Sequence, residues 1–228
     1  MTSLMLLLVI AASSAMMVSF IVESSTWWIR GACAPGMIGL YVSRSNIYQY
    51  CGRFFALSFN ALIALSIENR ASASYVTITL AAGFALTCIV HAALLLGGAP
   101  TRLAILILGK ILFLPNQIIV EEKTKPERRW AITLPTGIAT LCYCLGMALP
   151  LLLAVFVPQY RMSLSYTGQI VNAVGTFMLL FMVDQPMFRS LDNARLHRDL
   201  PSYTLGRICA FGIAAVICLI FYGLIRNG

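Results

Sequence analysis

Charged side chains are scarce in this sequence, and acidic ones are the scarcest. Only 11% of the 228 residues are Asp, Glu, Lys or Arg, with 8 acidic residues against 16 basic ones. A soluble domain carries roughly 25% charged residues, so this composition argues against one. Hydrophobic residues make up 60% of the chain, and the mean hydropathy is +0.86. We therefore expect residues 1–228 to form a single integral membrane domain of the all-α class, a polytopic helix bundle.

The sequence also lacks the motifs of common catalytic sites. Paired carboxylates, a GxSxG elbow, an HExxH motif and a glycine-rich phosphate loop are all missing. The 7 cysteines include no CxxC pair, and we expect small buried side chains, neither disulfides nor metal ligands. His91 has no second ligand nearby, which favours a hydrogen-bonded structural role. We expect no metal or other cofactor, and a transporter rather than an enzyme.

Six apolar segments are long enough to cross a bilayer, which takes about 20 residues. They are residues 4–22, 47–67, 75–96, 133–157, 164–183 and 204–224. Residues 31–46 are interrupted by glycine and proline, so they predict a bent or interfacial connection.

A further segment, 101–120, is long enough to span, but Lys110 at its centre and Pro115 argue against a simple crossing. If it stays on one face, six spans place twelve basic residues on one side and Arg70, Arg161 and Arg226 on the other. If it crosses, seven spans divide them nine against five. The positive-inside rule favours six transmembrane helices plus one interfacial or re-entrant helix, with seven spans as the alternative. The net charge of +8 then reflects topology and anionic membrane lipids, not nucleic acid.

Two spans carry polar side chains on a face of small residues. Arg53 and Asn60 are seven residues apart, almost two helical turns, so they point the same way. A charge in hydrocarbon costs about 3 kcal/mol, so this face should meet a partner helix or a wet cavity. The stripe on the fifth span consists of Ser165, Gly168, Asn172 and Gly175. A packed helix–helix seam with a structural ion pair and a polar path through the membrane both fit these stripes.

Several charges gather at one predicted membrane boundary, and guanidinium groups suit phosphate. Arg53 lies about 9 Å inside its predicted span, at a level where Asp184 of another helix could pair with it. We expect a diphosphate headgroup to bind Arg53, helped by Arg30 and by Arg189 or Arg207. The charge-compensating residues would be Glu23, Asp184 and Glu68, and the residues lining a wet path for sugars would be Asn60 and Asn172.

Three stretches resemble, in order and spacing, the alternate lipid II flippase family, the Amj proteins that substitute for the main flippase MurJ. They are FIVESSTWWIRG, GRFFALSFNALIALSIE and PQYRMSLSYTGQIVNAVGTFMLLFMVDQP, and together they cover about a quarter of the chain. The resemblance implies a flippase for undecaprenyl-diphosphate-linked peptidoglycan precursor (lipid II). Such a protein moves its cargo from the cytoplasmic to the outer leaflet of the bacterial inner membrane.

Other functions stay open at this point. The cargo could be another undecaprenyl-linked oligosaccharide, and the protein could instead be a membrane enzyme acting on prenyl phosphates or a structural subunit of an envelope complex. The expected partners are a lipid-linked saccharide and anionic membrane lipids. Because six helices are few to enclose a large glycan, a homodimer with a shared cavity is a further hypothesis.

Overall fold

The computed structural model describes residues 3–34, 36–69, 71–115 and 129–227, and in these ranges the regular elements are all helices. The elements are α1 (Ser3–Gly31), α2 (Ile38–Glu68), α3 (Ala73–Leu96), α4 (Ala99–Ile111), α5 (Trp130–Phe156), the short 3-10 turn η1 (Pro158–Tyr160), α6 (Arg161–Met178), the π-helical turn η2 (Leu179–Asp184), α7 (Gln185–Asp192) and α8 (Leu196–Asn227).

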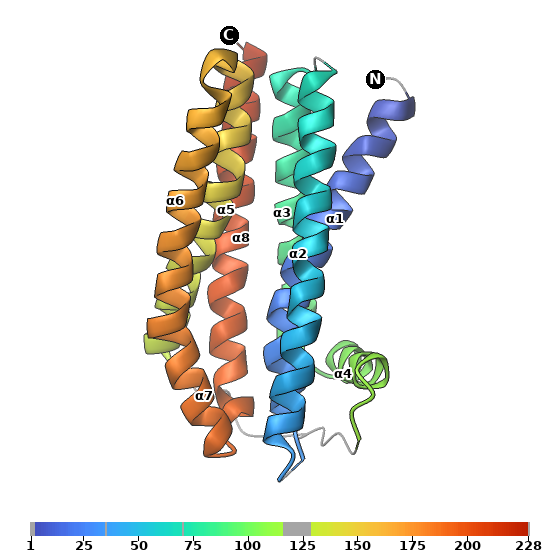
Figure 1. The fold of residues 1–228 in the computed structure, drawn as a ribbon, viewed down its shortest axis with the longest axis vertical. Coiled ribbons are helices and arrows are strands. Elements are labelled where there is room, and N and C mark those ends of the chain that lie inside the picture. The colour runs from blue at the N-terminus through green and yellow to red at the C-terminus, as the bar shows by residue number, and fades with distance from the viewer. Residues whose placement is uncertain (1–2, 35, 70, 116–128, 228) are drawn as a thin grey trace.

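Six helical segments are long and apolar enough to cross a membrane, which confirms the predicted all-α bundle. They are Met5–Gly31, Ile38–Glu68, Ala73–Leu96, Trp130–Ala154, Tyr166–Asp192 and Leu196–Arg226. The seventh helix, α4, has 13 residues, or about 20 Å of length, too short for a hydrocarbon core of about 30 Å. It lies across one end of the bundle (Figure 1). Residues 116–120 of the predicted seventh segment lie outside the described residues.

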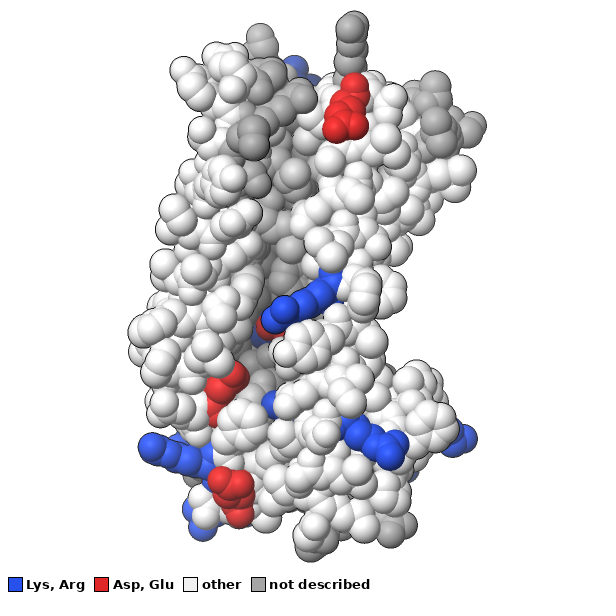
Figure 2. Space-filling view, in the orientation of Figure 1, with Lys and Arg blue, Asp and Glu red and all other residues white. Residues whose placement is uncertain are grey.

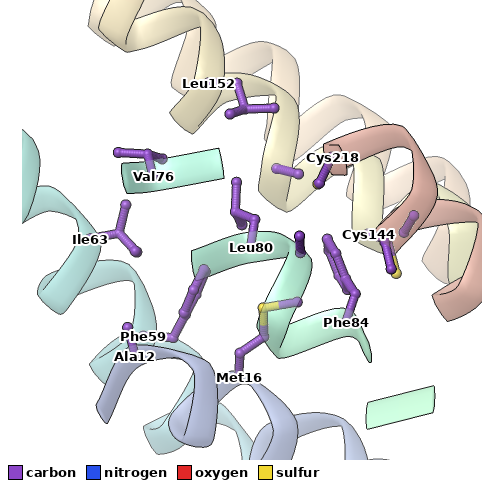
Figure 3. Packing of buried hydrophobic residues seen from close by; sticks show 14 of the residues in the cluster. Ala12, Met16, Phe59, Ile63, Val76, Leu80, Phe84, Cys144, Leu152 and Cys218 are labelled. Atoms are coloured by element: carbon purple, nitrogen blue, oxygen red, sulfur yellow. The ribbon is translucent and has the colours of Figure 1, made fainter. Parts of the chain in front are cut away.

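The six long helices pack in a curved row. α1 packs on α2 and α3, α8 packs on α3 and α5, and α6 packs on α5, so that α2 and α6 end the row. The hydrophobic core lies between α1, α3, α5 and α8, where labelled residues such as Met16, Leu80 and Phe84 meet (Figure 3). Between the α2 side and the α6 side the surface is hollowed lengthwise, and Figure 2 shows charged side chains in this groove.

Small residues allow α5 to approach both of its neighbours closely. A side chain at Gly206 of α8 would collide with backbone atoms of α5, and one at Gly168 of α6 would collide with Gly146 and Pro150. A side chain at Gly175 would lie 3.0 Å from the carbonyl oxygen of Ala139, a tight contact as well. The predicted stripe on the fifth span therefore forms a helix–helix seam, although the side chain of Ser165 lies outside the described residues.

The predicted connection at 31–46 is too long, because α2 begins at Ile38. Two tertiary contacts hold its first turns in place. The Tyr41 hydroxyl donates to the Pro115 carbonyl at 2.7 Å, and Arg44 Nη1 donates to the Leu112 carbonyl, beyond the end of α4, at 2.6 Å. Arg53 is therefore at the middle of α2, about 22 Å from either end, and not about 9 Å inside it.

The cysteine prediction is wrong in one respect. All seven cysteines are free, and Cys144 and Cys218 are buried as expected, but Cys51 and Cys209 are exposed. Both lie in spanning helices, where an exposed thiol is still a small apolar group suited to lipid contact.

Candidate functional site

A pair of opposite charges lies between α1 and α8. Arg207 is fully buried, and its Nη2 lies 2.9 Å from Oε1 of Glu23, whose side chain is 26% exposed. This distance brings the two opposite charges into direct contact. Arg207 Nη1 donates to the hydroxyl of Tyr203 at 2.7 Å. The pair is about 12 Å along α1 from its end at Gly31, well inside the bundle.

Polar atoms without a hydrogen-bond partner gather on the two helices around Arg207. Within the described residues they include Arg207 Nε, the hydroxyl of Thr204 one turn earlier on α8, and those of Thr136 and Thr140 on the adjoining α5. A buried polar group costs about 1–3 kcal/mol when nothing satisfies it. Such groups are normally satisfied by water or by a ligand. The α5–α8 interior near Arg207 therefore has the chemistry of a hydrated site.

Arg30, the second buried arginine, is also held by protein groups. Its Nε donates to Ser45 Oγ at 2.8 Å and its Nη2 to Asn46 Oδ1 at 2.7 Å. Its guanidinium carbon lies 4.6 Å from the centre of the Trp27 ring and 5.4 Å from that of Phe188. Arg30 thus joins α1 to α2 through two hydrogen bonds and two ring contacts.

Asp184 closes the π-helical turn η2, just before Pro186, which has no N–H to continue the helix. Turns of this kind are frequent at functional sites. The half-buried carboxyl of Asp184 lies within electrostatic range of Arg30, Glu23 and Arg207. The predicted pairing of Asp184 with Arg53 is not formed, because no ion pair within 4 Å joins these two described residues.

Arg53 is exposed, and its guanidinium carbon lies 4.9 Å from the centre of the Tyr50 ring. It lies on the flank of the α2 face that packs inward through Gly52, Phe59 and Ile63. Asn60, two turns further along, is exposed in the same direction. Halfway along the groove in Figure 2, a basic side chain reaches across the hollow with a carboxylate behind it.

The other predicted polar residues lie elsewhere. Glu68 is exposed at the far end of α2, about 22 Å along the helix from Arg53. Asn172 lies in the α5–α6 seam against Gly146, and its buried Oδ1 has no hydrogen-bond partner within the described parts of the chain. Asn60 is thus on the exposed side of the bundle and Asn172 between two helices.

His91 has the structural role that the sequence predicts. It is fully buried, its Nδ1 lies 2.8 Å from the Thr87 carbonyl, and its Nε2 lies 2.8 Å from Ser24 Oγ. In the described ranges, no group of three or more His, Cys, Asp or Glu side chains could hold a metal ion.

Arg189 lies away from these residues, at the end of the bundle where α7 meets α8. It is exposed and lines a cavity together with Arg129 and Arg195. The sequence reasoning counted Arg129 and Arg195 among the basic residues of one side but did not single them out. The sequence signal for this cavity was the concentration of basic residues at this end of the bundle. That concentration alone does not show which side chains share a cavity.

The arrangement offers a fixed dipole of buried charges, an exposed arginine at the middle of a spanning helix, and a basic cavity at one end. Such groups can bind and pass anions, and they supply no nucleophile or metal centre that we can identify in the described residues. Comparison of the chain with known protein families, with curated proteins and with solved structures finds no match.

Proposed function

We propose that the protein is a flippase for a lipid that carries a diphosphate-linked saccharide, with lipid II as the leading cargo. The observation that carries this proposal is the exposed side chain of Arg53 at the middle of α2. An arginine within the hydrocarbon core costs about 3 kcal/mol on insertion scales and more on an isolated helix. A position like this is stable when the side chain faces water or an anion, and the lengthwise groove offers such a surface.

The arginines follow one another along the bundle. Measured along its own helix from the end near α4, Arg207 is about 17 Å inside and Arg53 about 22 Å inside. Arg189 lies at that end itself, in the last turn of α7. A diphosphate moving along the groove would meet a guanidinium near the end and again near the middle, while its acyl chains remain in the lipid.

The driving force need not come from a nucleotide. An inside-negative potential favours the outward movement of a negative charge by about 2.3 kcal/mol per 100 mV. A diphosphate cargo carries more than one such charge, so the membrane potential favours export.

Rescue of bacteria depleted of their principal lipid II flippase tests this proposal. The wild-type chain should restore growth, Arg53→Ala should not, and Arg53→Lys should restore it in part because it keeps the charge and loses the fork. Arg226→Ala, a change to an exposed arginine near the other end of α8, is the matched control and should rescue fully at equal membrane abundance.

Each outcome has a clear meaning. A wild-type chain that does not rescue would remove lipid II as the cargo, and flipping of another undecaprenyl-linked oligosaccharide in liposomes would then be measured. Full rescue by Arg53→Ala would refute the mechanism. Consumption of a prenyl phosphate by the purified protein would favour the enzyme alternative.

A further inference from the structure

An open cavity at the end of the bundle is lined by three arginine side chains. It has a volume of about 250 Å³, below the roughly 300–1,000 Å³ of pockets that hold drug-sized ligands and far above the space of one water. Its lining is Arg129, Pro186, Arg189, Ser190, Asn193 and Arg195. Five of these six side chains are polar, and three carry a positive charge, so the space suits a phosphate group rather than a whole saccharide.

Among the described residues, one acidic side chain pairs with an arginine of this cavity. The buried carboxylate of Asp199 accepts hydrogen bonds at 2.9 Å from Arg129 Nη1 on both of its oxygens, and the Ser190 hydroxyl also donates to it. Asp199 therefore neutralises Arg129 and fixes the wall of the cavity. Within the described parts of the chain, neither Arg189 nor Arg195 has an ion pair. Among the described side chains, two guanidinium groups of the lining therefore have no ion-pair partner.

The neighbouring aromatic residues place the cavity at the level of lipid headgroups. Trp130, next to Arg129 in the sequence, is 66% exposed, and Phe188, next to Arg189, is 36% exposed. Large aromatic side chains at the end of a spanning bundle, tryptophan above all, are typical of the membrane interface. A cavity at this depth lies within reach of the phosphates of the adjacent leaflet.

We propose that Arg189 and Arg195, on the wall fixed by Arg129 and Asp199, bind a phosphate group of an anionic lipid in the leaflet at the α4 end of the bundle. This inference deepens the proposed function and rests on it in one respect, namely that the lipid diphosphate of the cargo is first held here before it reaches Arg53. Binding of a lipid phosphate itself does not depend on transport.

Lipid binding to the purified full-length protein, followed by native mass spectrometry, tests this site. The probes are phosphatidic acid, undecaprenyl diphosphate and the zwitterionic phosphatidylcholine, with inorganic phosphate as a soluble competitor. The two anionic lipids should bind, and phosphatidylcholine, whose phosphate is balanced by its choline group, should not. Arg189→Gln and Arg195→Gln should each weaken binding of the phosphorylated lipids about tenfold, the usual worth of a charge-assisted hydrogen bond.

Two further variants distinguish binding by these particular arginines from attraction by the overall positive charge of the protein. The double variant Lys110→Gln/Arg226→Gln removes the same charge at two other exposed positions and should bind like the wild type. The variant Arg189→Lys/Arg195→Lys keeps the charge and loses the planar forks, so its binding should fall. Equal losses in the Arg189→Gln/Arg195→Gln and Lys110→Gln/Arg226→Gln proteins, or full binding by the lysine variant, would overturn the proposal.

The source of the phosphate is decided in the same experiment. Displacement of the lipids by millimolar inorganic phosphate, with the same dependence on Arg189 and Arg195, would overturn the lipid assignment in favour of a free phosphate. Lipid binding that depends on these arginines in a chain that does not rescue flippase-depleted cells would sustain this site and refute only the proposed cargo. If the wild-type chain rescues these cells but the Arg189→Gln/Arg195→Gln variant still binds lipid normally, the site would be refuted and the proposed cargo would stand.

Discussion

Replacement of Glu23 by glutamine measures how strongly the buried pair holds α1 to α8. Removing one partner of a buried ion pair usually costs about 3–5 kcal/mol, because it leaves the other charge without compensation. Arg207 is fully buried, whereas the Glu23 side chain is 26% exposed and partly screened by solvent. We therefore expect Glu23→Gln to lower the free energy of unfolding by about 3 kcal/mol.

Removing the arginine instead of the glutamate should lower the free energy of unfolding by less. Arg207→Met leaves a carboxylate that solvent can reach and removes the hydrogen bond to the Tyr203 hydroxyl, a loss of about 1–2 kcal/mol. The double variant Glu23→Gln/Arg207→Met buries no charge, and we expect it within about 2 kcal/mol of the wild type. The double-mutant cycle should then give a coupling energy of about 2–3 kcal/mol between the two positions.

Equilibrium unfolding in mixed detergent micelles, followed by helical circular dichroism, gives the free energies of unfolding of the wild type, the two single variants and the double variant. Arg226→Met is the control for loss of an exposed arginine and should change stability by less than about 0.5 kcal/mol. A Glu23→Gln protein as stable as the wild type, or strictly additive single changes, would refute the reasoning. A stable double variant that does not rescue flippase-depleted cells would show that the pair also acts in transport.

Three other changes have expected outcomes that follow from packing and hydrogen bonding. Gly206→Ala should destabilise the bundle by about 1–3 kcal/mol, because its methyl group would meet the α5 backbone; Gly223→Ala, with nothing within 4 Å, should not, and thermal unfolding compares the two. Arg44→Ala should release α4, since it removes the two bonds to the chain just after that helix; amide exchange should rise in residues 99–113 and stay unchanged in the core. Asn172→Ala should leave stability unchanged or raised, because it removes a buried acceptor with no partner in the described structure; unfolding would check this, and a loss of rescue at full stability would assign Asn172 to the cargo path.

Hydropathy predicted the spans well because insertion in a bilayer depends on the sum of side-chain transfer energies, which is a property of the sequence alone. It did not predict where α2 begins. Residues 38–46 include Arg44, Ser45 and Asn46 and are too polar to be assigned to a span by composition. They are helical because Tyr41 and Arg44 bind the chain after α4 and because Arg30 binds Ser45 and Asn46. These contacts join positions far apart in sequence.

In the predicted site, too, the sequence indicated local features but not the contacts that depend on tertiary packing. Periodicity correctly placed the glycines of α6 on one face, but it could not decide which side chains would find protein partners. Arg207 and Glu23 are 184 positions apart, and only the packing of α1 on α8 brings them together. Arg129 and Asp199 meet only because α5 packs on α8.

The four arginines expected to bind a diphosphate differ in what an incoming anion would have to displace. Arg30 and Arg207 are buried and already contact protein groups, so an incoming anion would have to break existing contacts. Arg189 and Arg53 are exposed and hold no carboxylate in the described chain. On the proposed function, a diphosphate moving from one to the other passes Glu23, which repels it while it is ionised, and Arg207, which attracts it once Glu23 is displaced. The exchange of one anion for another on Arg207 costs less than exposing a bare guanidinium, because a charge remains paired throughout.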